Sequence, residues 1–166
     1  GGGMTTYFLA ALDERIAASA PVSGVLSSTG WVKQRLSFAH CDCQYPVNSH
    51  GMLYAEVGAL IAPRAQLLCN ADADPGFPMN AFTEMVDKTA EIYRLYKAEN
   101  AIGTAVAPGG HVDTEAIRLP VYNFFMKHFL GASAPMTSEG STPLPKDADL
   151  VCFRDGLPLN ERLTRI

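Results

Sequence analysis

Short apolar runs alternate with longer segments of helical spacing along most of this chain, and this alternation restricts the folds that it can adopt. The expected elements, in order, are helix 5–12, strand 18–25, helix 53–61, strand 65–70, helix 80–99, strand 102–107 and helix 114–130. Strands and helices that alternate at this spacing form a parallel sheet with right-handed crossovers. We therefore predict an α/β fold, a three-layer arrangement in which helices flank a parallel sheet of about three strands.

The two longest predicted helices carry the clearest signals. Between residues 80 and 99, apolar positions recur at steps of three and four residues, as on one face of a helix. In the helix 114–130, Pro120 predicts either a kink or the first turn, and Gly131 is a typical residue to end it. His128 falls on the apolar side of this helix, so we expect it to pack in the core.

Composition sets the class of protein. The 166 residues are enough for one domain, and 48% apolar and 18% charged residues are typical of a globular protein. The net charge of −4 provides no basic footprint for nucleic acid, and no apolar run reaches the roughly 18 residues that span a membrane.

At residue 132 the composition changes to Ser, Pro, Thr, Gly and Ala, which is typical of a linker or loose wrap. We place the domain in residues 1–131.

Four cysteines in a chain of this length do not make a small disulfide scaffold. Cys69 lies in an apolar run and is expected to be a buried small hydrophobe. The run His40-Cys41-Asp42-Cys43 suggests a metal, but Cys-x-Cys is too tight for zinc, and only the distant Cys152 or His50 could complete a site. We favour a loop that packs or lines the pocket, and we predict no metal and no organic cofactor.

Three consecutive glycines lead directly into the apolar helix 5–12. In a nucleophile elbow, Gly-x-Ser-x-Gly, the serine stands on a strained turn between a strand and a helix, and its neighbours must be small. If a serine precedes Gly1, then Gly1 is the residue after it and Gly2 is the closing glycine. The Gly1 N–H would then be one donor of an oxyanion hole. The alternative is that the glycines are a cloning scar or a flexible tail.

An aspartate and a histidine follow two of the predicted strands. Asp74 lies in the loop after strand 65–70, and His111 follows strand 102–107 and two glycines. Open α/β sheets place functional groups in such loops, and an acid before a histidine is the order of the last two members of a Ser…Asp…His triad. We assign His111 as general base and Asp74 as the acid that orients it. The alternatives are Asp72 as the acid, turn-forming aspartates and an exposed loop histidine.

The motifs that carry a family resemblance extend over about residues 1–131. They are Gly1-Gly2-Gly3-Met4, Ala11-Leu12-Asp13-Glu14-Arg15-Ile16, Ala20-Pro21-Val22, His40-Cys41-Asp42-Cys43, Ala59-Leu60-Ile61-Ala62-Pro63-Arg64, Asn70-Ala71-Asp72-Ala73-Asp74, Phe77-Pro78, Gly109-Gly110-His111, Asp113-Thr114 and Phe124-Phe125. Ala-Pro-Arg ahead of strand 65–70 is fairly specific among them. Together they resemble the α/β-hydrolase superfamily and, more narrowly, the acetyl-xylan-esterase-like hydrolases of bacteria.

The resemblance implies the C-terminal half of an α/β-hydrolase domain that hydrolyses carboxylic esters without a cofactor. The substrate would be a small-molecule or polysaccharide ester, for example an acetyl group on a plant or algal polysaccharide. Residues 145–166 look like the start of a further segment, so 132–166 would be a linker and the beginning of an extension. The nucleophilic serine is not in the chain, because the four serines between residues 19 and 28 come after the elbow helix. We expect a fragment with no esterase turnover of its own.

Three other functions stay open at this point. An oligopeptidase of the same fold would have the same triad order. A non-catalytic α/β binding domain would keep a degenerate pocket. A metal-binding module would use Cys41 and Cys43.

Overall fold

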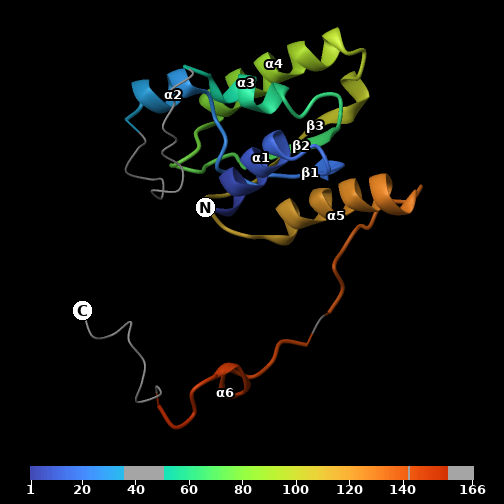
Figure 1. Ribbon diagram of the computed structural model, residues 1–166. Helices are drawn as coiled ribbons and strands as arrows, with labels where there is room; N and C mark the ends of the chain where they lie inside the picture. The colour runs from blue at the N-terminus through green and yellow to red at the C-terminus, as the bar shows by residue number, and fades with distance from the viewer. Residues whose placement is uncertain (36–50, 142, 157–166) are drawn as a thin grey trace.

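The computed structural model describes residues 1–35, 51–141 and 143–156. Its three strands form one sheet in the order β1-β2-β3, with β1 at Ala18–Ser19, β2 at Ala65–Ala71 and β3 at Ile102–Ala107. Both pairs of neighbouring strands are parallel (Figure 1). The predicted parallel α/β arrangement is therefore confirmed.

Helices cover both faces of the sheet. The helical segments are α1 (Gly2–Leu12), α2 (Ser28–Lys33), α3 (Tyr54–Ala59), α4 (Met79–Leu95), the 3₁₀ turn η3 (Glu99–Ala101), α5 (Glu115–Leu130) and α6 (Asp147–Leu150). Leu68 of β2 packs with residues of α1, α3 and α4, whereas its neighbours Leu67 and Cys69 pack with α5. Successive strand residues point to opposite faces, so the strand separates two layers of helices. Figure 1 shows α5 on one side of the sheet and α3 and α4 on the other.

The central strand β2 is buried along its whole length, as expected for a continuous apolar run covered on both faces. Cys69 in its middle has no exposed surface, which confirms it as a buried small hydrophobe. Burial raises the pKa of the Cys69 thiol to about 12, because a thiolate is poorly solvated there.

The first strand is shorter than the predicted span 18–25. Regular pairing is confined to β1, with one further bridge between Val22 and Cys69. Pro21 has no N–H to contribute to a ladder. Ser23 and Gly24 then take left-handed backbone angles, with φ of 54° and 83°, which turn the chain out of the strand direction.

Four further details differ from the sequence-based predictions. Residues 27–30 lie in none of the predicted elements, yet they begin α2, whose first turn is capped by Ser27 Oγ accepting from the Gly30 N–H at 2.9 Å. A short helix, α6, lies within the segment expected to be a linker. α5 begins at Glu115 and continues through Pro120, so Pro120 is not in its first turn. His128 is exposed rather than in the core, although it lies against the ring of Phe124, which packs on the core below α5.

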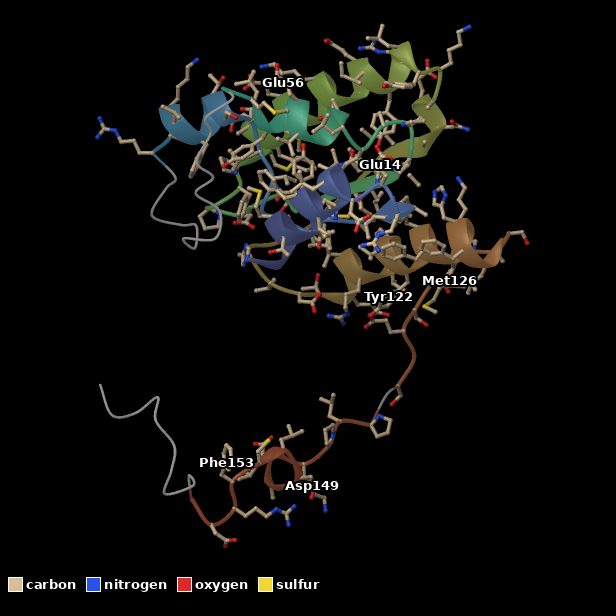
Figure 2. The ribbon with its side chains drawn as sticks, in the orientation of Figure 1. Glu14, Glu56, Tyr122, Met126, Asp149 and Phe153 are labelled. Carbon is tan, nitrogen blue, oxygen red and sulfur yellow. The ribbon has the colours of Figure 1, made fainter. Side chains whose placement is uncertain are left out.

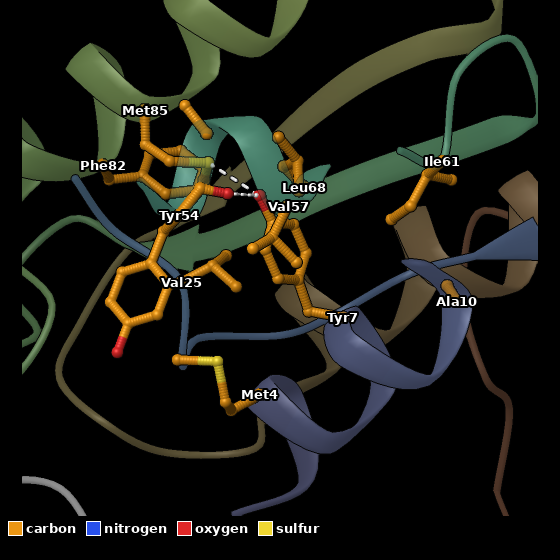
Figure 3. Packing of buried hydrophobic residues seen from close by; sticks show 11 residues of the cluster. Met4, Tyr7, Ala10, Val25, Tyr54, Val57, Ile61, Leu68, Phe82 and Met85 are labelled. Carbon is orange, nitrogen blue, oxygen red and sulfur yellow. Dashed lines mark hydrogen bonds between the residues drawn. The ribbon is translucent and has the colours of Figure 1, made fainter. Parts of the chain in front are cut away.

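The largest buried cluster joins α1 to α3 and α4 (Figure 3). Tyr7 of α1 is fully buried at its centre, and its hydroxyl donates to the backbone carbonyl of Tyr54 at 2.6 Å. The Sδ of Met85 in α4 lies 3.6 Å from the same hydroxyl. Burial raises the pKa of Tyr7, so the phenol stays a neutral hydrogen-bond donor. These contacts fix the orientation of α1, whose first residues reach the site described below.

Residues 132–141 are attached to α5 by side-chain contacts. The Asn123 amide group donates to the Met136 carbonyl at 2.9 Å and accepts from the Met136 N–H at 2.7 Å. Arg118 forms a two-pronged ion pair with Glu139, with both N–O distances 2.6 Å. Figure 2 shows Tyr122 on α5, and Asp149 on the chain that continues away from the sheet. Among the described residues, no helix combines the length and the apolar character needed to cross a membrane.

Candidate functional site

Two loops meet at the carboxyl end of the sheet. Asp74 follows β2 by three residues, and His111 follows β3 by four. Because the strands are parallel, both loops lie at the same edge. Asp74 Oδ2 is 2.8 Å from His111 Nδ1, the distance of a hydrogen bond. The structure thus brings together the two residues that the sequence singled out.

The Asp74 carboxylate is held at both oxygens. Its side chain is 1% exposed. Oδ1 accepts from the Gly76 N–H at 2.9 Å, and Oδ2 accepts from the Ser23 hydroxyl at 3.2 Å as well as facing His111. A buried carboxylate needs such donors, because burial removes its water. The acid is therefore held in one orientation.

Asp72, the alternative acid, has a different role. Its Oδ1 accepts from the Gly109 N–H at 2.8 Å, and the Ala73 N–H donates to the Gly109 carbonyl at 2.9 Å. These bonds tie the loop after β2 to the loop after β3. Gly109 has a φ of 112°, which favours glycine at that turn. Asp72 therefore fixes the spacing of the two loops, and it is Asp74 that faces His111.

The imidazole of His111 is open on one side. Its side chain is 66% exposed, and its ring stacks on Phe77 with centroids 5.8 Å apart. Nδ1 is directed at Asp74, so Nε2 is the ring nitrogen available to a reacting group. In this geometry the pair can accept a proton at Nε2 and stabilise the charge that results.

A cavity of about 730 Å³ adjoins His111. Gly1, Gly2 and Gly3 form one part of its wall, and Arg118 and Tyr122 of α5 form another. Gly1 and His111, 110 positions apart in the chain, thus line one cavity. The Gly1 N–H as an oxyanion donor stays a prediction.

Arg118 lines the cavity, and its positive charge is paired with the carboxylate of Glu139. Its ion pair with Glu139 raises the pKa of the Arg118 guanidinium and lowers the pKa of the Glu139 carboxyl. Asp113 lies 3.4 Å from the same guanidinium. Among the described residues, no group of three or more His, Cys, Asp or Glu side chains is placed to hold a metal ion. His40, Cys41, Cys43 and His50 lie outside the described residues.

The close approach that an elbow requires occurs at the third glycine. A Cβ at Gly3 would overlap the carbonyl groups of Val22 and Ser23, whereas a Cβ at Gly2 would meet nothing within 4 Å. Gly2 as the closing glycine of an elbow stays a prediction, and the tight packing lies at Gly3 because the helix turns that residue toward the segment after β1.

We expect Gly3→Ala to lower the free energy of unfolding by about 2–3 kcal/mol, since the methyl group must displace backbone. Gly2→Ala is the matched control and should leave stability unchanged or raise it by up to about 1 kcal/mol through helix propensity. Urea unfolding of the two variants measures both. Equal stability of the two would show that helix α1 does not pack on the Ser23 backbone as described.

Comparisons with solved structures decide the fold. The methylesterase BT1017 is 28% identical, with a TM-score of 0.62 over 77% of this chain and 28% of that one. A carbohydrate esterase family 15 glucuronoyl esterase from Caldicellulosiruptor kristjansonii is 19% identical, with a TM-score of 0.63 over 87% of this chain and 45% of its own. The glucuronoyl esterase from Sporotrichum thermophile is 19% identical, with a TM-score of 0.62 over 91% and 47%.

The fold is that of the α/β-hydrolases. The chain spans 28–47% of the length of these three structures, which are serine esterases of the α/β-hydrolase type. No protein-family model and no curated protein matches it. Asp74 and His111 follow neighbouring strands of this α/β-hydrolase sheet, in the chain order that the fold uses for acid and base.

Sequence reasoning missed two polar residues of the site. Ser23 is one of the four serines between residues 19 and 28 that were excluded as the nucleophile, yet its hydroxyl donates to the acid. Asn70 is fully buried in β2, and its amide donates to the Phe77 carbonyl at 2.7 Å, which holds the loop that carries Asp74. Asn70 and Gln66 are the two polar residues of the strand β2, and a polar residue at a buried strand position was the available signal for Asn70.

Proposed function

We propose that this chain is the C-terminal part of a serine hydrolase that cleaves carboxylic esters through a Ser-Asp-His triad, with the serine directly before Gly1. The observation that carries the proposal is the buried Asp74 carboxylate, 2.8 Å from His111 Nδ1, at a cavity whose wall begins with Gly1. The esterase neighbours support the class of reaction.

In the complete protein the serine hydroxyl attacks the ester carbonyl while His111 Nε2 takes its proton. The imidazolium is stabilised by Asp74, which also fixes the tautomer. The Gly1 N–H donates to the oxyanion of the tetrahedral intermediate. His111 then gives the proton to the leaving alcohol, and an acyl-serine remains. Water, deprotonated by His111, attacks the acyl-serine, and the carboxylic acid leaves as serine is restored.

The substrate class is an ester of a carbohydrate. A glucuronoyl esterase from Sporotrichum thermophile has been solved with methyl 4-O-methyl-β-D-glucopyranuronate, an alkyl ester of a sugar acid. The first neighbour is described as a methylesterase. These names favour an alkyl ester of a uronic acid beside the acetyl ester that the sequence resemblance implies.

The chain alone should show no turnover of 4-nitrophenyl acetate, because an acyl-enzyme cannot form without the nucleophile. The purified chain is assayed beside a blank without protein and beside its own His111→Ala variant. Turnover by the chain that disappears in the variant would contradict the proposal that the nucleophile lies outside these residues.

The upstream coding sequence tests the proposal as a whole. A protein extended by those residues should contain Gly-x-Ser before Gly1 and hydrolyse acetyl or methyl-uronate esters. Cleavage of a peptide 4-nitroanilide without ester cleavage would favour the oligopeptidase instead. An upstream sequence lacking the serine would overturn the proposal in favour of a non-catalytic binding domain.

A further inference from the structure

Ser23 has a backbone conformation that serine rarely adopts. Its φ of 54° lies in the left-handed region, where a side chain crowds the following carbonyl. Glycine would take this conformation without strain, as Gly24 does beside it with a φ of 83°. Strained residues that persist tend to cluster at functional sites, so an observed outlier motivates a search for a role.

The contacts of Ser23 indicate that role. Its N–H donates to the Cys69 carbonyl at 3.0 Å, which fastens the residue to β2. Its hydroxyl lies 3.2 Å from Asp74 Oδ2 and 3.5 Å from Asn70 Oδ1, and the residue is 7% exposed. The nearer acceptor is the same carboxylate oxygen that faces His111.

We propose that Ser23 is a positioning residue whose hydroxyl holds Asp74 Oδ2 opposite His111 Nδ1. The proposal rests on the proposed function, in which Asp74 and His111 act together. The Gly76 N–H fixes only Oδ1, and the Ser23 hydroxyl is the donor that holds Oδ2 independently of His111. The Ser23 hydroxyl supplies the second point that fixes the carboxylate plane. The left-handed turn at Ser23 brings this hydroxyl to the acid.

Other charged groups near His111 must be held constant in any test. Arg118 and the Gly1 ammonium group line the same cavity, and Asp113 follows two residues later. Asp72 bonds the Gly109 N–H in the same loop. None of these is altered in the variants below, and all samples are compared at one pH and salt concentration.

The experiment reads the tautomer of His111 by ¹⁵N NMR of the imidazole ring in the chain as it stands, so no nucleophile is required. Signals of His111 are those lost in His111→Gln. The unaltered chain should show His111 as the Nδ1–H tautomer. Ser23→Ala and Ser23→Gly should each lower the ratio of Nδ1–H to Nε2–H by about fivefold, the size expected for loss of one hydrogen bond.

Two variants separate positioning from folding. Ser23→Gly relieves the backbone strain, so it stays folded while lacking the hydroxyl. Ser19→Ala is the matched control, because Ser19 is also buried and its Oγ has no hydrogen-bond partner among the described residues. It should keep the tautomer of the unaltered chain. Retention of that tautomer in Ser23→Gly, or its loss in Ser19→Ala, would overturn the proposal.

Asp74→Asn distinguishes this proposal from the function on which it rests. If Asp74→Asn removes the Nδ1–H preference but Ser23→Ala and Ser23→Gly keep it, the positioning role is wrong and the acid–histidine pair stands. If Asp74→Asn also leaves the tautomer unchanged, the pair itself fails, and both the proposed function and the role of Ser23 fail with it.

Discussion

If the protein extended upstream carries the proposed serine, His111→Ala in it should lower kcat for ester hydrolysis by about 10⁴-fold or more. The serine would then lose its general base, and the leaving alcohol would lose its proton donor. Asp74→Asn should lower kcat by a similar factor. An amide that donates to His111 Nδ1 favours the tautomer with the proton on Nε2, which cannot accept the serine proton. Steady-state rates on one activated ester measure both.

Asp72→Asn is the matched control for these variants. The amide oxygen can still accept from the Gly109 N–H, so the loop spacing and the rate should stay within about twofold of the parent. A loss of rate in Asp72→Asn as large as the loss in Asp74→Asn would show that the acid has been assigned to the wrong residue. If His111→Ala retained most of the rate, His111 would not be the general base.

Arg64→Ala should lower the free energy of unfolding by about 2–4 kcal/mol. The guanidinium donates to the Ala10, Asp13 and Ile16 carbonyls at 2.7–3.1 Å, and to the Leu60 carbonyl at 3.3 Å. The first three carbonyls end α1 and the turn after it, and such groups lack partners within the helix. Urea unfolding monitored by circular dichroism measures the loss.

Arg94→Ala is the control for the loss of an arginine as such. Its side chain is 60% exposed and lies 3.8 Å from Glu91, so its removal should change stability by less than about 0.5 kcal/mol. The free energy of unfolding of Arg64→Lys should fall between those of the two alanine variants. A single lysine ammonium group cannot donate to all the carbonyls that the forked guanidinium reaches. An Arg64→Ala protein as stable as Arg94→Ala would contradict the capping role.

The sequence-based prediction worked best where burial is continuous. β2 was predicted because an apolar run reports a strand covered on both faces, and every residue of it is buried. The pairing of Asp74 with His111 followed from strand order, since residues after neighbouring parallel strands reach one edge. A motif placed on the correct strands therefore predicted a contact between residues 37 positions apart.

The failures share a physical cause, which is dependence on contacts distant in the sequence. α2 has six residues, too few to be stable by itself, and Ser27 Oγ also donates to Glu84 of α4 at 2.7 Å. The role of Ser23 depends on a backbone angle and on a partner 51 positions away. His128 was misplaced because burial decreases along α5: Ile117 is buried, Phe124 is partly buried against the same cluster, and His128 near the end of the helix is exposed.

The attachment of residues 132–141 to α5 bears on where the molecule can be shortened. Glu139 is a main counterion of Arg118, and Arg118 stands in the cavity wall. A chain ending at residue 131 would leave that guanidinium with Asp113 alone, 3.4 Å away, and would make the cavity more attractive to anions. The smallest unit that preserves the cavity's electrostatic character therefore extends at least to Glu139, beyond the last helix that covers the sheet.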